Sequence, residues 1–278
     1  MGKRTSNYDR YMKHTEDDSP YQNLESLATS SLLECILYEN SQVISAIEKA
    51  LPSIEKVIEK SYSYLVQGGR LFYIGAGTSG RLGIVDASEC LPTFGLDNVI
   101  IGIIAGGDSA IRKAVEFAED NSEQAWIDLQ AYDANSKDVV IGISASGKTP
   151  YVVGGLKRAK EKGIYTVGLV CNAHTLIHQV AEDTVEILTG AEIISGSTRM
   201  KAGTAQKIVL NMISTTLMIK LGRVKGNKMI DMQLSNQKLI ERGTRMLMQF
   251  LEISYEEAKK LLLEHKSVRK VLELYQKQ

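Results

Sequence analysis

Hydrophobic residues between Leu24 and Val66 recur every three or four positions, which is the spacing of one face of a helix. Pro52 interrupts this pattern, and a proline inside a helix removes a backbone hydrogen bond. We therefore expect two helices here, with a boundary or kink near Pro52. The preceding residues, 1–22, are polar and aperiodic, which predicts a mobile arm or a segment that a partner orders.

The pattern then changes to short β-rich runs that lead into glycine or serine and a helical segment. These runs are Leu71–Ile74, Val99–Ile104, Val139–Ile143, Tyr165–Val170 and Thr184–Leu188. Strands that alternate with helices indicate a parallel sheet covered on both faces. The sequence thus predicts an α/β fold: a doubly wound, Rossmann-like three-layer α/β/α arrangement around a parallel five-stranded sheet, with helical N- and C-terminal additions.

The last part of the chain is predicted to be helical. A long segment that follows Ser197 and ends at Gly222 is apolar nearly all round, so we expect it to lie in the core or in a subunit interface. Residues from about 232 to 275 have the pattern of three shorter helices, and Ser254 marks the start of one.

The composition disfavours nucleic acid and anionic membranes as partners. Lysine plus arginine equals aspartate plus glutamate at 33 each, so no overall field attracts nucleic acid or an anionic membrane. The sequence has neither a signal-peptide pattern nor a run of 18 apolar residues, and we expect a cytoplasmic protein. Cys35, Cys90 and Cys171 are too few and too scattered for a disulfide framework or a metal cluster, so we expect free thiols.

Two loops match well-known nucleotide-binding patterns. Residues 75–80 fit the dinucleotide fingerprint, but the next strand ends in Ala105-Gly106-Gly107 and not in the acidic residue that holds a ribose. Residues 142–149 match the P-loop, but none of the other strands ends in the aspartate that would support magnesium. Both a dinucleotide and a nucleoside triphosphate are therefore disfavoured.

A smaller anion fits both loops together. Each follows a parallel strand and opens a helix, so free backbone N–H groups and positive helix ends point into one crevice. Short hydroxyls beside them favour a monophosphate ester bound without a metal. One such loop alone would be interpreted as turn and cap residues, but the pair, together with Ser195–Thr198, favours binding. The binding residues that we expect are Gly77, Thr78, Ser79, Ser144, Ser146, Gly147, Thr149 and Ser197.

Two carboxylates stand out. Glu89 shares an apolar helix face with Leu82 and Val85, where desolvation would raise its pKa toward the range useful for proton transfer. Asp86 lies close to the same face and is the alternative candidate for this carboxylate. On the next predicted helix, Glu119 lies at the edge of the apolar stripe. Spacing alone leaves open that both glutamates are ordinary solvated helix residues.

Cations and histidines are weaker signals. His174 and His178 have the i, i+4 spacing of metal ligands, which more often marks a helix start. Arg199, Lys201 and Lys207 begin the long helix, where they are expected to meet either a substrate phosphate or a partner subunit.

Around these residues the sequence resembles the N-acetylmuramic acid 6-phosphate etherases of the sugar isomerase (SIS) superfamily. The likeness covers about residues 24–245, and the run from Gly196 to Lys207 is highly specific. The matching stretches are Gly69–Leu82, Asp86–Cys90, Ala105–Gly107, Ala118–Asp120, Ala145–Gly147, Thr149–Tyr151 and Ser195–Lys207.

The resemblance implies a homodimeric SIS fold that binds a sugar phosphate and needs no cofactor or metal. It implies that water and N-acetylmuramic acid 6-phosphate give N-acetylglucosamine 6-phosphate and D-lactate, within N-acetylmuramate degradation and peptidoglycan recycling or scavenging. By motif, Glu89 protonates the departing lactate and Glu119 removes the C2 proton. With this resemblance, we expect an arm over 1–22, helices over 23–55, the SIS domain over 56–222 and helices over 223–278.

The sequence departs from the family pattern at three places. Lys148 replaces the usual arginine, Asn172-Ala173-His174 replaces Asn-Pro-Gly, and the region after about Thr244 is shorter than in many members. Two alternatives remain: a sugar-phosphate-sensing regulatory protein of the same fold, and an aldose–ketose isomerase. A DNA-binding sensor is disfavoured because residues 1–66 contain seven lysines and arginines against ten aspartates and glutamates.

Overall fold

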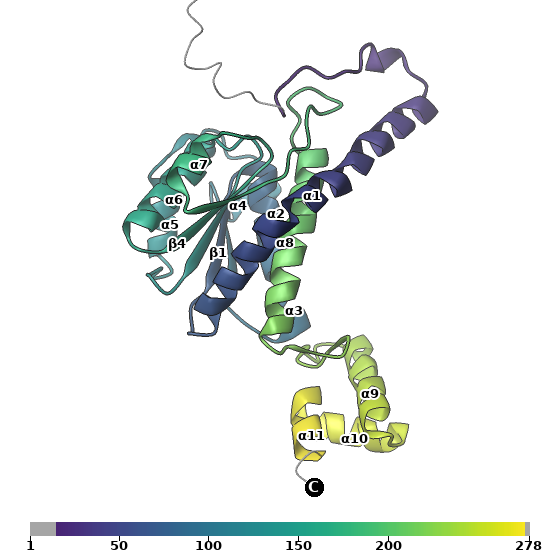
Figure 1. Ribbon diagram of the computed structural model, residues 1–278. Coiled ribbons are helices and arrows are strands. Elements are labelled where there is room, and N and C mark those ends of the chain that lie inside the picture. Colours follow the sequence, from purple (N-terminus) through teal and green to yellow (C-terminus); the bar gives the residue numbers. More distant parts are fainter. Residues whose placement is uncertain (1–14, 276–278) are drawn as a thin grey trace, which may run out of the picture.

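Five parallel strands form one sheet in the order β2-β1-β3-β4-β5. In the computed structural model, which describes residues 15–275, this sheet lies at the centre of the larger part of the molecule (Figure 1). The strands are β1 (Leu71–Gly75), β2 (Ile100–Ile104), β3 (Val139–Ile143), β4 (Tyr165–Val170) and β5 (Asp183–Glu186). The predicted strands are therefore confirmed to within two residues.

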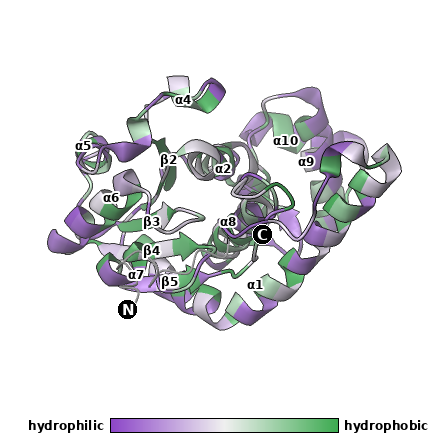
Figure 2. Ribbon diagram, turned by 90° about the horizontal axis from the view of Figure 1, so that it is seen from above, coloured by the Kyte–Doolittle hydropathy of each residue, from purple (hydrophilic) through white to green (hydrophobic). Residues whose placement is uncertain are grey.

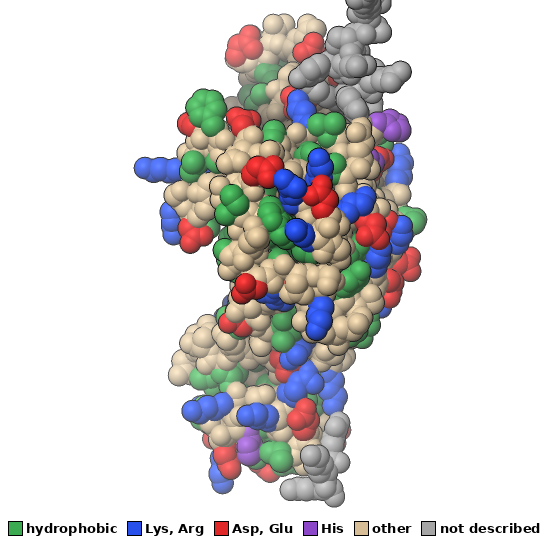
Figure 3. All heavy atoms as spheres, turned by 90° about the vertical axis from the view of Figure 1, so that its left-hand side faces the viewer, with side chains coloured by type: hydrophobic (Ala, Val, Ile, Leu, Met, Phe, Trp, Pro, Cys, Tyr) green, Lys and Arg blue, Asp and Glu red, His purple; other side chains and the backbone are tan. Residues whose placement is uncertain are grey.

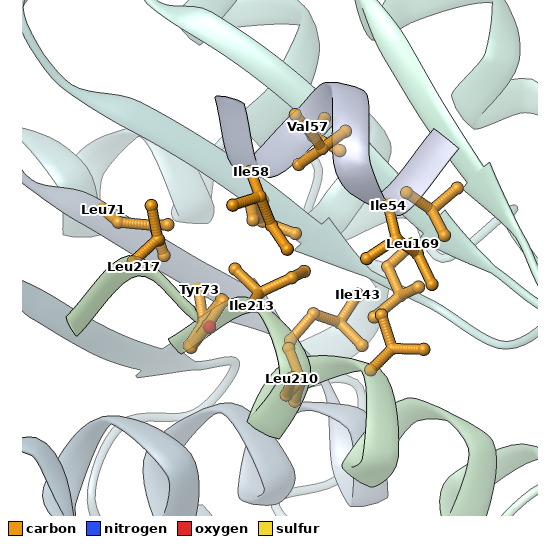
Figure 4. Close-up of a cluster of buried hydrophobic side chains, with 14 of the residues drawn as sticks. Ile54, Val57, Ile58, Leu71, Tyr73, Ile143, Leu169, Leu210, Ile213 and Leu217 are labelled. Carbon is orange, nitrogen blue, oxygen red and sulfur yellow. The ribbon is translucent and has the colours of Figure 1, made fainter. Parts of the chain in front are cut away.

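Helices cover both faces of the sheet, as the top view in Figure 2 shows. On one face lie α1 (Thr29–Leu65), α2 (Gly77–Ser88) and α8 (Lys201–Lys220), and on the other α5 (Gln124–Gln130), α6 (Pro150–Glu161) and α7 (Leu176–Val180). In Figure 4, Ile58 of α1 and Ile213 of α8 lie on the side of Tyr73 in the first of these two cores, and Ile54 lies beside Leu169. The predicted doubly wound, three-layer α/β fold is confirmed.

After the 3-10 turn η2 (Leu24–Ser26), the 37 residues Thr29–Leu65 form the single helix α1, so the prediction of two helices is wrong. Pro52 lies inside α1 on its exposed side. Because proline has no N–H, the carbonyl of Glu48 loses its helical hydrogen bond, and Glu48 is an exposed residue. The buried stripe continues on both sides of the proline, with Ile47 before it and Ile54 after it. Packing against the sheet and α8 thus keeps the helix continuous across Pro52, where a boundary or kink was expected.

The C-terminal helices form a separate group with a core of their own, which lies at the far end of α8 (Figure 1). It contains α9 (Gln237–Leu251), α10 (Tyr255–His265) and α11 (Val268–Tyr275), as predicted, and the hairpin β6 (Val224–Lys225) and β7 (Lys228–Met229) leads into it. The Ser254 hydroxyl accepts a hydrogen bond from the backbone N–H of Glu257 and so caps α10. No helix among residues 15–275 is long and apolar enough to cross a membrane.

The sheet topology reverses between β1 and β3. The chain runs from β1 to β2 on one side and then returns to β3 on the other, and Gly75 pairs in register with Ile143. The loops after these two strands therefore leave the same edge of the sheet side by side. In doubly wound sheets this reversal is where ligands bind.

Candidate active site

The loop after β1 leads directly into α2. The helix begins at Gly77, three residues earlier than Gly80, and Gly77 has a positive φ of 52°. No side chain caps the N-terminus of α2, so the backbone N–H groups of its first turn are available to an anion. The Ser79 hydroxyl donates to Gln206 Oε1 of α8 over 2.9 Å, which fixes its side chain at the crevice.

The loop after β3 is built around Ser144. Its buried hydroxyl accepts a hydrogen bond from the backbone N–H of Gly147 over 3.1 Å and lies 2.9 Å from the Thr149 hydroxyl. The Ser146 hydroxyl is 3.4 Å away. Gly147 has a φ of 67°, and a Cβ there would lie 2.4 Å from the Thr175 side chain, so only glycine fits.

The two loops enclose one crevice of about 470 Å³, which also reaches Glu119. Of the expected binding residues, it brings together Gly77, Thr78, Ser79, Ser144, Ser146 and Thr149. Gly147 shapes the loop but does not line the crevice, and Thr198 lines it where Ser197 was expected. Lys148 also lies on the wall and contributes a positive charge.

Glu119 reaches the crevice from a turn, and the helix predicted around it is wrong. The helix α4 (Ser109–Arg112) ends early, and Glu119 lies in the 3-10 turn η3 (Ala118–Asp120). A Cβ at Gly106 would lie 2.9 Å from Cβ of Val115, which shows how closely the chain folds back over the loop after β2. Glu119 therefore reaches the site because the chain after α4 folds back over Gly106, and not because it lies on a helix face.

Glu89 lies elsewhere, and the expectation that it is a desolvated group on an apolar stripe is wrong for this chain. It follows the last residue of α2, Ser88, and its side chain is exposed and does not line the crevice. Because α2 begins at the crevice and rises about 1.5 Å per residue, Glu89 lies roughly 18 Å from its first turn. On the shared face only Leu82 packs against the core, whereas Val85, one turn before Glu89, is 57 % exposed.

Asp86 is the buried carboxylate of α2. It accepts hydrogen bonds from Asn211 Nδ2 over 2.6 Å and from the Ser214 hydroxyl over 3.1 Å. Burial raises the pKa of Asp86, while these two donors oppose the shift. Asp86 therefore joins α2 to α8 behind the site and does not line it.

The start of α8 is held by acidic residues of the same chain. Glu192 accepts the backbone N–H groups of Lys201 and Ala202 over 3.0 and 2.9 Å, and the ammonium group of Lys201 pairs with Glu39. Burial raises the pKa of Glu192. Lys201 thus contacts neither the crevice nor an exposed surface, and Arg199 and Lys207 do not line the crevice either.

Two acidic wall residues were not proposed from the sequence as site residues. Asp120 belongs to the same turn as Glu119, and Glu16 belongs to the aperiodic N-terminal segment, where no period marks a functional position. A larger cavity of about 880 Å³ lies away from both loops, between the end of α8 and the C-terminal helices. Among residues 15–275, no cluster of three or more histidine, cysteine, aspartate or glutamate side chains is arranged for a metal, and the three cysteines are free.

Charge is spread evenly over the outer face of the sheet domain. Figure 3 shows lysine and arginine side chains interspersed with aspartate and glutamate over this face, without a continuous basic area. The view therefore offers no stripe of the kind that binds nucleic acid.

Comparison with known proteins points to one group. The chain matches the profiles of the glucokinase regulatory protein N-terminal SIS domain over residues 45–160, the SIS domain over 109–216, and the C-terminal lid domain of glucokinase regulatory protein over 226–278. It is 58 % identical over 262 residues to the N-acetylmuramic acid 6-phosphate etherase of Christiangramia forsetii, covering 94 % of this chain and 96 % of the relative.

A second relative agrees with this, and a solved structure shares the fold. The N-acetylmuramic acid 6-phosphate etherase of Porphyromonas gingivalis is 53 % identical over 260 residues, which cover 93 % of this chain and 95 % of the relative. The structure of a phosphoheptose isomerase from Francisella tularensis superposes with a TM-score of 0.53 at 19 % identity, over 68 % of this chain and 98 % of that chain. At that identity the likeness concerns the fold alone.

Proposed function

This chain belongs to the N-acetylmuramic acid 6-phosphate etherases, and on that premise we propose that it cleaves the lactyl ether of N-acetylmuramic acid 6-phosphate. Water and this substrate give N-acetylglucosamine 6-phosphate and D-lactate, which makes the protein a carbon–oxygen lyase. The observation that carries the proposal within the molecule is the crevice, where two serine/threonine loops and Glu119 meet.

The phosphate of the substrate binds between the two loops. The uncapped start of α2 and the hydroxyls of Thr78, Ser146 and Thr149 supply hydrogen-bond donors, and Lys148 supplies a positive charge. Lys148 is a point charge, whereas the arginine usual in the family can bind two phosphate oxygens at once. The crevice therefore holds a phosphate without a nucleotide-type magnesium site.

The elimination needs one base and one acid. In the open-chain sugar, the C1 aldehyde acidifies the C2 proton, and the lactate oxygen at C3 is β to that carbonyl. Glu119 takes the C2 proton, the C2=C3 double bond forms, and the C3–O bond breaks as the lactate oxygen is protonated. Water then adds at C3 of the unsaturated aldehyde and a proton returns to C2. Since the balance requires no oxidant or reductant, we propose a reaction without a cofactor.

Glu89 is the acid in this scheme, and we propose that it acts in the crevice of a second subunit. Within one chain its distance from the loops is too great for direct contact. Both glutamates lie beside exposed apolar side chains: Val85 is one turn before Glu89 and 57 % exposed, and Phe117 is two residues before Glu119 and 80 % exposed. Such groups are typical of a surface that a partner covers, which supports a homodimer.

The main test is D-lactate release from N-acetylmuramic acid 6-phosphate by the purified protein, without added metal or nucleotide. Glu119→Gln and Glu89→Gln should each reduce lactate release by a factor on the order of 100 or more. Glu119→Gln should also abolish exchange of the C2 proton with solvent, whereas Glu89→Gln should spare it. Turnover like that of the wild type in either variant refutes the role given to that residue.

Mixing the two variants tests the shared site. If Glu89 acts in the partner's crevice, a heterodimer of Glu89→Gln and Glu119→Gln has one intact site and one doubly altered site. After subunit exchange, random pairing should restore about a quarter of the wild-type activity. If each crevice uses its own Glu89, no mixture regains activity.

The same assays separate the alternatives. An aldose–ketose isomerase would exchange the C2 proton and convert a sugar phosphate without releasing lactate, and a regulatory protein would bind the sugar phosphate without either change. The curated relatives favour the etherase over both. We place the reaction in the cytoplasm, within the degradation of N-acetylmuramate from peptidoglycan, because a charged sugar phosphate does not cross the membrane hydrocarbon unaided.

A further inference from the structure

The N-terminal segment is attached by buried hydrogen bonds to Asn172, in the loop after β4, and through Asn172 to the loop after β3. Thr15 is 0 % exposed, and its backbone N–H donates to Asn172 Oδ1 over 3.0 Å. Asn172 Nδ2 donates in return to the Thr15 hydroxyl over 2.8 Å and to the carbonyl of Ala145 over 3.3 Å. Because both partners are buried, this clamp fixes the backbone at Thr15 relative to the second loop.

A second attachment lies four residues later. The backbone N–H of Ser19 donates to the Ser195 hydroxyl over 2.8 Å, and the Ser19 hydroxyl donates to the carbonyl of Ile193 over 2.7 Å. The backbone between the two attachments therefore runs along one edge of the crevice. Three acidic residues lie between them, and of these only Glu16 lines the crevice.

The carboxylate of Glu16 lies against a glycine. A Cβ built on Gly196, which has a φ of 71°, would be 3.4 Å from Glu16 Oε2. A larger side chain at Gly196 would therefore crowd this carboxylate. Glu16 lines the same crevice as Glu119 and the serine and threonine residues of both loops.

A carboxylate at this place selects for hydrogen-bond donors. It can only accept hydrogen bonds, and the phosphate and lactyl carboxylate of the substrate are also acceptors and carry the same sign of charge. The donors of the substrate are its sugar hydroxyls and the N–H of its acetamido group. Glu16 can therefore accept hydrogen bonds from the sugar, whereas it would repel the phosphate and the lactyl carboxylate.

We propose that Glu16 is a sugar-binding residue of the crevice, which accepts hydrogen bonds from the hydroxyl or acetamido N–H donors of the amino sugar. This inference rests on the proposed function for the identity of the ligand. The clamp between Thr15 and Asn172 holds Glu16 in place, so a segment with no regular structure becomes one wall of the binding site.

Calorimetric titration of the full-length protein tests this with two probes that carry no lactyl ether: N-acetylglucosamine 6-phosphate and inorganic phosphate. Glu16→Ala should weaken binding of the sugar phosphate about tenfold or more, because a hydrogen bond to a charged group is lost. Binding of inorganic phosphate should not weaken. Asp18→Ala removes the same charge from the same segment, but away from the crevice wall, and should leave both affinities unchanged.

Two results would overturn the assignment: an unchanged affinity of Glu16→Ala for the sugar phosphate, or an equal loss for both probes, which would indicate a general disturbance of the loops. The outcome for the reaction is separate. If the wild type binds the sugar phosphate but releases no lactate from N-acetylmuramic acid 6-phosphate, the proposed reaction fails, while a selective loss in Glu16→Ala still establishes the sugar contact.

Discussion

The ammonium group of Lys201 and the carboxylate of Glu39 form a buried ion pair that joins the first turn of α8 to the N-terminal half of α1. The Tyr21 hydroxyl donates to the same carboxylate over 3.0 Å, and Glu192 holds the backbone N–H of Lys201. One polar network thus fixes the start of α8 next to the crevice.

Lys201→Met should lower the free energy of unfolding by about 3–5 kcal/mol, because the carboxylate of Glu39 would stay buried without its cation. Urea unfolding followed by circular dichroism measures this. Lys220→Met is the control: its pair with Glu59 is partly exposed, with the side chains 28 % and 58 % accessible, and its loss should cost less than about 1 kcal/mol. Equal losses of unfolding free energy in the two variants would show that the buried pair stabilises the fold no more than the partly exposed pair does.

Asp86→Asn should raise stability at neutral pH. Burial raises the folded-state pKa of Asp86 above its ordinary value of 3.8, so this group favours the folded state most at low pH, and that contribution is lost as the pH rises through the folded-state pKa. The asparagine keeps an acceptor for Asn211 and Ser214 but carries no charge. Thermal unfolding should therefore show a higher midpoint for the variant at pH 7, with the difference shrinking toward pH 3.8. A variant less stable than the wild type at every pH would contradict this.

Ser146→Ala and Ser144→Ala should have different effects. Ser146 lines the crevice with a hydroxyl that does not support the backbone, so its loss should raise KM roughly fivefold to tenfold and leave kcat nearly unchanged. Ser144 accepts the N–H of Gly147 and so supports the turn, and its loss should also lower the free energy of unfolding by about 1 kcal/mol. Steady-state kinetics and urea unfolding distinguish the two, and an unchanged KM for Ser146→Ala would argue against its phosphate contact.

His174 has a φ of 54°, in the left-handed region that favours glycine. The family's Asn-Pro-Gly pattern has its glycine at this position, which explains the family preference. His174→Gly should be neutral or stabilise by up to about 1 kcal/mol, whereas the β-branched variant His174→Val should destabilise by about 1–2 kcal/mol. Chemical unfolding of both variants measures the difference, and a stable valine variant would mean that the turn has moved.

The strands, the two hydroxyl-rich loops and the C-terminal helices could be predicted because their signals are local. Alternating strands and helices define a doubly wound sheet, and the hydroxyl-rich loops lie where such a sheet binds ligands. The family motifs at Glu89 and Glu119 could also be recognised directly. By contrast, Pro52 is a strong local signal that the packing of α1 against the sheet and α8 overrides.

The sequence by itself therefore determined the layered fold, the family and the two loops that enclose the crevice. Only the tertiary structure decided which acidic side chain faces which environment. Asp86 and Glu89 are three residues apart on nearly the same helix face, and the position of α8 buries the first and leaves the second exposed. Glu16 has no periodic signal at all, and only the clamp to Asn172, which is 157 residues away from Thr15 in the sequence, brings it to the crevice. Periodicity reports a face of one element, whereas burial depends on what packs against that face.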